Sequence, residues 1–270
     1  MEVKLAKQAG FCFGVRKAVD EALNIQGKAN TIGPLIHNRY VVKELEKKGI
    51  REIDSLSDSD APTIIIRTHG ASDRLIHEIV SKGHNILDLT CPFVKKVQQY
   101  AKDLEKEGYK VIIIGEKNHP EVLAIADNLE DAIIVEKPED VDGLGRFDKI
   151  GVVVQTTQSV SNFTNIISKL ESKSDKFRIH NTICNATKER QEGAVKLAKE
   201  VDLMIIVGGK DSANTKRLTE LCSKIVDTKQ IESEYELDKK WLKGKEKIGI
   251  AAGASTPDSI IKRIKEKLTQ

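Results

Sequence analysis

The chain has 270 residues, of which 39% are hydrophobic, enough for one large core or two to three small ones. Its 44 Lys and Arg residues against 41 Asp and Glu leave a net charge of only +3, with the signs interspersed, so we expect no nucleic-acid or membrane partner. The N-terminus has no signal-peptide pattern, and no apolar run approaches the roughly 18 residues that span a bilayer. We therefore expect a cytoplasmic protein, whose four cysteines are metal ligands, catalytic groups or buried side chains rather than disulfides.

The same series of elements is predicted three times along the chain, after Cys12, Cys91 and Cys184. In the first copy, residues 1–84, a strand-like run leads to Cys12, and a helix, strand, helix, strand and helix follow at 15–23, 31–33, 41–45, 63–67 and from 73. In the second copy, residues 85–177, the same elements are at 94–104, 110–115, 122–129, 151–155 and from 160. In the third copy, residues 178–270, they are at 194–201, 203–208, 218–225, 247–251 and from 257. This alternation predicts an α/β fold of three small domains with parallel sheets.

Polar loops follow corresponding strands of the three copies. The strand after each cysteine helix ends in glycine, and a polar residue stands four positions later, in the pairs Gly33 and His37, Gly115 and His119, and Gly208 and Ser212. Ligands of open parallel sheets bind beyond the carboxyl ends of the strands, where these loops must lie. Three such edges that face one another would build one shared pocket.

Each of the three cysteines precedes a helix, where free backbone N–H groups and the helix dipole favour a thiolate. They lie too far apart in the sequence for a local zinc knuckle. Three thiolates without a fourth fit a 4Fe-4S cluster with one open iron, or a catalytic zinc with a bound water. Cys222 has no counterpart in the other copies and shares a helical stripe with Leu218, so we predict that it is a core residue.

Nine motifs between residues 9 and 258 resemble those of one enzyme family, the 4-hydroxy-3-methylbut-2-enyl diphosphate reductases of the methylerythritol phosphate pathway. The motifs are AGFCFGVRKAV, GPLIHN, RTHGAS, DLTCPFVKKV, GEKNHPE, QTTQS, NTICNATKERQ, VGGKDSANTKRL and AGASTPD. The resemblance implies a pseudo-threefold trefoil around one 4Fe-4S cluster, held by Cys12, Cys91 and Cys184. It also implies two-electron reductive dehydroxylation of the allylic diphosphate to isopentenyl and dimethylallyl diphosphates. The chain shows no nucleotide-binding fingerprint, so we expect the electrons to come from a ferredoxin or flavodoxin.

The resemblance also implies roles for side chains in the polar loops. Glu121 corresponds to the acid that delivers the proton to the leaving hydroxyl, and Thr157 to the threonine that bonds that oxygen; Thr156 and Thr187 are expected nearby. The residues expected to bind the substrate, besides Thr157, are His37, His69, His119, Ser212, Asn214 and Ser255. Ala213 departs from the family pattern, in which a second serine is common, so one phosphate contact is expected to be missing or supplied by the backbone.

Two alternatives stay open on the residues alone. One is a three-thiolate zinc hydrolase that acts on a phosphorylated substrate. The other is a non-catalytic iron–sulfur redox sensor or carrier, which would leave Glu121, Thr157 and the phosphate-type loops without a role.

Overall fold

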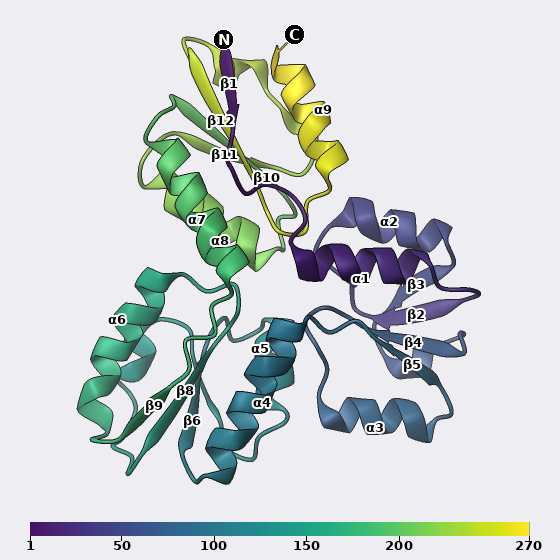
Figure 1. Cartoon of the computed structure of the whole chain (residues 1–270), viewed down its shortest axis with the longest axis vertical. Helices are drawn as coiled ribbons and strands as arrows, with labels where there is room; N and C mark the ends of the chain where they lie inside the picture. Colours follow the sequence, from purple (N-terminus) through teal and green to yellow (C-terminus); the bar gives the residue numbers. More distant parts are fainter. Residues whose placement is uncertain (270) are drawn as a thin grey trace. The chain divides into compact units, whose positions relative to one another are not determined.

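The structure of the protein, a computed structural model, describes residues 1–269 (Figure 1). The described chain forms two compact units. Unit 1 comprises Met1–Lys17, Ile36–Glu44 and the stretch that begins at Asn185. Unit 2 comprises Ala18–Leu35 and Leu45–Cys184.

The strands of the described residues pair in parallel into three four-stranded sheets. Sheet A lies in unit 1 and contains β1 (Glu2–Leu5), β12 (Lys247–Ala252), β10 (Leu203–Val207) and β11 (Thr228–Ile231), in that order. The other two sheets lie in unit 2. Sheet B contains β5 (Asn85–Asp88), β4 (Thr63–Ile66), β2 (Ala29–Ile32) and β3 (Ile50–Ile53), and sheet C contains β9 (Phe177–Ile179), β8 (Ile150–Val154), β6 (Lys110–Ile114) and β7 (Ile133–Val135).

Each predicted helix is present, with ends that shift by up to five residues, except that α7 begins nine residues earlier than predicted. The helices are α1 (Phe13–Leu23), α2 (Arg39–Lys47), α3 (Asp73–Ser81), α4 (Pro92–Lys106), α5 (Pro120–Ala126), α6 (Val160–Leu170), α7 (Asn185–Ala198), α8 (Ala213–Ser223) and α9 (Asp258–Thr269). α1, α4 and α7 begin directly after the three repeated cysteines, as the sequence predicts. No helix in the described part of the chain is both long and apolar enough to cross a bilayer.

The three sheets have the same strand order, so the threefold repeat is confirmed at this level. In each sheet the strand that leads to a cysteine lies at one edge. The closing strand comes next, then the strand that ends in glycine, and a short strand forms the other edge. The predicted copy boundaries differ from this pattern. β5 and β9 pair with β4 and β8 of the preceding copy, and β1 pairs with β12 of the last. The predicted starts at residues 85 and 178 therefore fall about one strand too early for the sheets.

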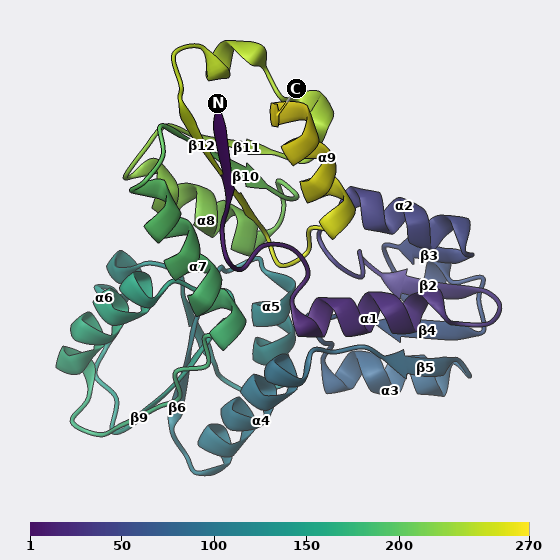
Figure 2. The ribbon, with the colours of Figure 1, turned by 45° about the horizontal axis from the view of Figure 1, so that its top comes forward.

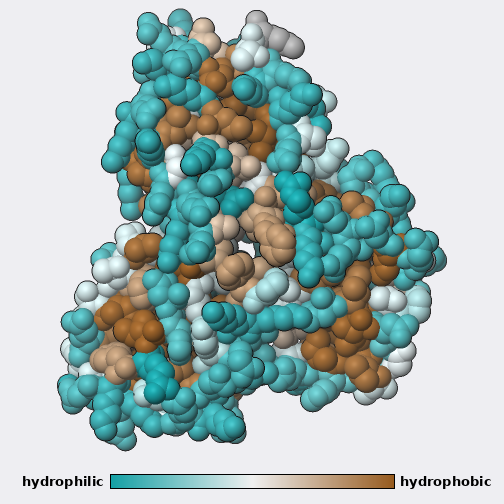
Figure 3. Space-filling view, viewed as in Figure 1, coloured by the Kyte–Doolittle hydropathy of each residue, from teal (hydrophilic) through white to brown (hydrophobic). Residues whose placement is uncertain are grey.

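Apolar residues cover both faces of sheets A and C. In sheet A, one face packs against Ile260, Ile264 and Leu268 of α9, which lies beside β1 in both ribbon views (Figures 1 and 2). The other face packs against α7 and α8, where Cys222 is fully buried, as predicted for a core residue. On the face shown in Figure 3, hydrophobic residues lie in the region of sheet A and α9, and hydrophilic residues surround them.

Candidate functional site

The loops that carry the three repeated cysteines have equivalent backbone contacts. The N–H groups of Cys12, Cys91 and Cys184 donate to the carbonyl oxygens of Ala254, Thr68 and Thr156, at 3.2, 3.0 and 3.1 Å. Each acceptor lies in the turn after the closing strand of the same sheet. The repeat therefore places every one of these cysteines at the carboxyl edge of a parallel sheet, where the sequence predicts a site.

The thiols of these three cysteines suit a metal better than the fourth thiol does. All four cysteines are thiols rather than disulfides, and Cys12, Cys91 and Cys184 are half-buried. The Cys12 sulfur accepts the N–H of Val15 at 3.5 Å, a contact that stabilises a thiolate at a helix start. Burial raises the pKa of Cys222 to about 11, so that thiol stays protonated. The thiols that fit a cluster or metal are thus those of Cys12, Cys91 and Cys184.

Glu121 in unit 2 is a buried carboxyl group held by one neighbouring residue. It is 1% exposed and lies in the first turn of α5. The Thr156 N–H donates to Oε1 and the Thr156 hydroxyl to Oε2, both at 2.7 Å. Thr156 lies just beyond β8, so the two adjacent strands β6 and β8 bring acid and hydroxyl together.

Burial controls the protonation of Glu121. Loss of water raises its pKa from the usual 4.5 to about 7, although the two hydrogen bonds from Thr156 lower it; Glu116 raises it further. A carboxyl group with this pKa is protonated in a large fraction of molecules near neutral pH. It can therefore act as a general acid.

His119 is fixed in one tautomer by the same turn. As the N-cap of α5, its Nδ1 accepts the N–H of Glu121 at 3.2 Å. In the neutral ring the proton must then be on Nε2, which can donate to a ligand oxygen. The ring packs edge-to-face on His69, with centroids 5.3 Å apart, so two predicted substrate-binding residues of unit 2 lie together.

The Thr157 hydroxyl is bonded within its own turn, and the bond predicted for it to the substrate oxygen stays a prediction. Its hydroxyl accepts the Nε2–H of Gln155 at 2.8 Å, and the Oε1 of Gln155 accepts the N–H of Glu116 at 2.8 Å. Thr156, expected only nearby, makes the direct bond to Glu121. Gln155 was not predicted as a site residue. Its place in the QTT motif, at the end of a strand, was the only signal in the sequence. The structure buries this glutamine, and a buried side-chain amide needs hydrogen-bond partners.

The predicted residues of unit 1 come from three loops that contact one another. The Ser255 hydroxyl donates to the His37 carbonyl at 3.3 Å. A Cβ on Gly209 would lie 2.5 Å from the same carbonyl, so the loop before α8 passes close to His37. Ser212 is the N-cap of α8, and its hydroxyl accepts the Thr215 N–H at 3.4 Å.

Asn214 is the clearest sign of a ligand in unit 1. Both polar atoms of its side-chain amide are buried and have no hydrogen-bond partner among the described residues. Such a group is costly unless a ligand or water satisfies it. Ala213 beside it is also buried and offers only its backbone. Thr187 is buried in α7, in unit 1, so it belongs to a different unit from Thr156.

Comparisons with known proteins agree over the whole length. The family model of the LytB protein matches residues 3–269. Relatives named 4-hydroxy-3-methylbut-2-enyl diphosphate reductase include those of Pelobacter propionicus, 45% identical over 98% of this chain and 96% of its own, and Geobacter sulfurreducens, 43% identical over 98% of each. A solved reductase described as the terminal enzyme of the non-mevalonate pathway is 40% identical, with a TM-score of 0.72 over 100% of this chain and 99% of its own. The reductase of Plasmodium falciparum has a TM-score of 0.93 at 32% identity, over 100% of this chain and 88% of its own.

Proposed function

The chain belongs to the LytB family, and on that premise we propose how its residues carry out the family's reaction. The protein is an oxidoreductase, a 4-hydroxy-3-methylbut-2-enyl diphosphate reductase of the non-mevalonate pathway. Two electrons and two protons replace the allylic hydroxyl by hydrogen and release water, which gives isopentenyl and dimethylallyl diphosphates. A hydrolytic zinc site and a non-catalytic sensor, the two alternatives, do not fit this family.

Membership of this family implies an iron–sulfur cofactor, and we assign its ligands to Cys12, Cys91 and Cys184. The support is their equivalent place in the three sheets, their half-buried thiols and the burial of the remaining thiol, Cys222. Three thiolates leave one iron of a 4Fe-4S cluster without a protein ligand. When bound, the cluster would supply electrons and a Lewis acid for the substrate oxygen. The trefoil arrangement around it stays a prediction.

Glu121 and Thr156 supply the proton in this proposal. The protonated carboxyl group can hand its proton to the Thr156 hydroxyl over their 2.7 Å contact, and the hydroxyl can donate its own proton onward. This assigns to Thr156 the relay expected of Thr157. Thr157 keeps a substrate-binding role, because its hydroxyl accepts from Gln155 and so directs its proton elsewhere.

The diphosphate is held by neutral donors more than by lysines. We assign this role to the residues predicted from the motifs: His37, His69, His119, Ser212, Asn214 and Ser255. The tautomer of His119 and the unsatisfied amide of Asn214 support the assignment, since both offer donors to an anion. Binding of the remote diphosphate would fix the allylic end for reaction.

Electrons are proposed to arrive from a one-electron carrier protein such as a ferredoxin or flavodoxin. The chain has no nucleotide-binding fingerprint that would let it accept hydride itself. A reducing compartment such as the cytoplasm would suit the cluster thiolates.

The observation that carries the mechanism is the buried Glu121 with its bonds to Thr156. The test is an anaerobic assay of the iron-loaded protein with a one-electron reductant and the allylic diphosphate. We expect both five-carbon diphosphates as products. An iron-loaded preparation that is reduced but leaves this substrate unchanged would contradict the proposal.

A further inference from the structure

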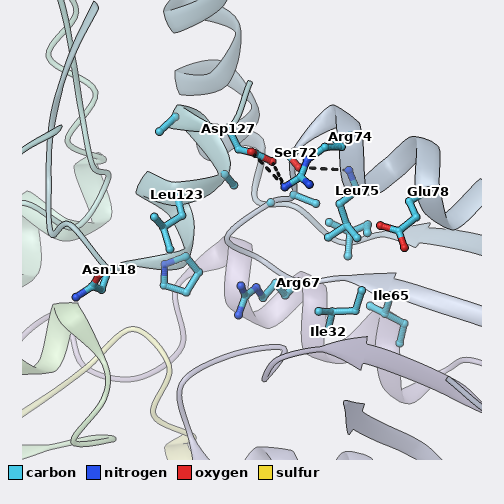
Figure 4. Close-up of a pocket in the computed structure, with 16 residues that line it drawn as sticks. Ile32, Ile65, Arg67, Ser72, Arg74, Leu75, Glu78, Asn118, Leu123 and Asp127 are labelled. Atoms are coloured by element: carbon cyan, nitrogen blue, oxygen red, sulfur yellow. Dashed lines mark hydrogen bonds and ion pairs between the residues drawn. The ribbon is translucent and has the colours of Figure 1, made fainter. Parts of the chain in front are cut away.

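Unit 2 contains a cavity of about 770 Å³ to which the proposed mechanism assigns no role. Figure 4 shows it between the carboxyl end of sheet B and the helices α3 and α5. The loops that carry His69 and His119 border it, because Arg67, Gly70, Asn118 and Pro120 line it. Neither histidine belongs to the lining.

Arg67 brings a positive charge without a directly bonded partner into this cavity. Its guanidinium forms no ion pair or hydrogen bond with any described residue, and Glu52 attracts it only through space. Burial lowers the pKa of Arg67, yet an arginine stays charged at physiological pH. A partly buried cation without a partner is unfavourable until an anion binds it.

The other charges of the lining are already neutralised. Asp127 forms an ion pair with Arg74 at 3.3 Å, drawn in Figure 4, and accepts a hydrogen bond from Ser72. Glu78 pairs with Lys82 at 2.8 Å. Lys82 lies outside the lining, so Arg67 is the one charged side chain of the lining that has no ion-pair partner among the described residues.

The position of the Arg67 guanidinium depends on a glycine. A Cβ on Gly33 would lie 2.5 Å from Arg67 Nη1, and Gly33 has φ of +70°, which favours glycine. In Figure 4 the guanidinium turns toward Asn118 and Leu123, and away from Leu75 and Glu78. Its five donors can thus meet a planar or tetrahedral oxyanion in the cavity.

The rest of the wall is aliphatic. Ile32 and Ile65 come from sheet B, Leu75 from α3, and Leu123 and Ala124 from α5. We propose that the cavity is a second ligand site, which takes a short aliphatic phosphate with its head on Arg67 and its tail on these side chains. The site lies within unit 2, and its lining includes none of the residues assigned to the diphosphate, although the loops of His69 and His119 border it.

Calorimetric titration of the anaerobic holoenzyme with 3-methylbutyl phosphate tests this site. The probe is saturated, so it cannot be reduced. We expect Arg67→Gln to weaken binding at least about tenfold, because a charge-assisted bidentate contact is lost. Arg74→Gln, which changes a lining arginine that is already paired, should weaken it less than about threefold. Arg67→Lys should give an intermediate affinity, and thermal unfolding of each variant checks its folding.

A second ligand, inorganic phosphate, separates the contribution of the phosphate head from that of the aliphatic tail. Inorganic phosphate should bind at least about tenfold more weakly than the ester, since burial of a five-carbon tail contributes through the aliphatic wall. Equal affinities would overturn the aliphatic class of ligand, and binding that Arg67→Gln leaves unchanged, or no binding at all, would overturn the site. Turnover of the allylic diphosphate is measured separately, so either failure leaves the reductase assignment intact.

Discussion

Among single residues, Glu121 would couple stability to catalysis through its proposed role as the acid. Because its pKa is raised from 4.5 to about 7, the folded state holds a proton that the unfolded state releases between these pH values. Stability must therefore fall as pH rises through this window, by about 3 kcal/mol when complete. Glu121→Gln keeps both contacts to Thr156 but cannot ionise. In urea unfolding, the variant should be up to about 3 kcal/mol more stable than the wild type at pH 8, and the two should be equally stable at pH 4.

The same variant separates this role from a purely structural one. Its turnover should fall by about a hundredfold or more and lose the decline above pH 7, because the proton donor is gone. A Glu121→Gln variant with wild-type turnover and an unchanged pH profile would exclude the carboxyl group as the acid.

The two neighbouring threonines provide a matched pair. Thr156→Val removes the hydroxyl that bonds Glu121 but keeps the backbone N–H bond, whereas Thr157→Val removes only the partner of Gln155. We expect Thr156→Val to lower kcat by about tenfold to a hundredfold and to raise the pH at which activity declines, since a bond that lowers the pKa of Glu121 is lost. Thr157→Val should mainly raise KM. The reverse pattern in steady-state kinetics would return the relay to Thr157.

Among the elements, the loop between β10 and α8 is the one whose shape most depends on glycine. Gly208 has φ of +152°, and a Cβ there would lie 2.5 Å from Thr215 Oγ1. Gly208→Ala should cost about 1 to 3 kcal/mol in the free energy of unfolding and raise KM, because this loop places Ser212 and Asn214. The control is Gly143→Ala, where a Cβ meets nothing within 4 Å; it should change stability by less than about 0.5 kcal/mol. Equal stability of the two variants would refute this dependence.

The sequence predicted some elements better than others, for physical reasons. Long apolar runs such as KVIII and LMIIV are buried on both faces and predicted β6 and β10 almost to the residue. The edge strands β3, β7 and β11 were missed, since all three are short and IREI and TKQI are also half polar. Repeat spacing also could not show that β5 pairs with the preceding copy, because strand pairing is a long-range contact.

In the molecule as a whole, motif position predicted the loops of the site but not the contacts within them. The cysteines and His119 were predicted because similar residue types stand at repeated places, whereas Glu121 was predicted only from the resemblance of the GEKNHPE motif to its family. The bond between Thr156 and Glu121 joins the turn after β8 to the first turn of α5, 35 residues away in the sequence, and nothing local in QTT tells which threonine faces the acid. Gln155 and Arg67 were missed because their roles depend on burial, which a single sequence does not give.

The central claim is that three equivalent cysteines hold one cluster with an open iron. The most direct measurement is iron and sulfide content, with electron paramagnetic resonance of the reduced protein, for the wild type and for single Cys→Ser variants at 12, 91 and 184, prepared anaerobically. Cys222→Ala is the control. Removal of this buried thiol should lower the free energy of unfolding by only about 1 kcal/mol. We predict about four irons per chain in the wild type and in Cys222→Ala, and loss of most iron in each of the other three variants. Full iron in any of those three, or its loss in Cys222→Ala alone, would contradict the account.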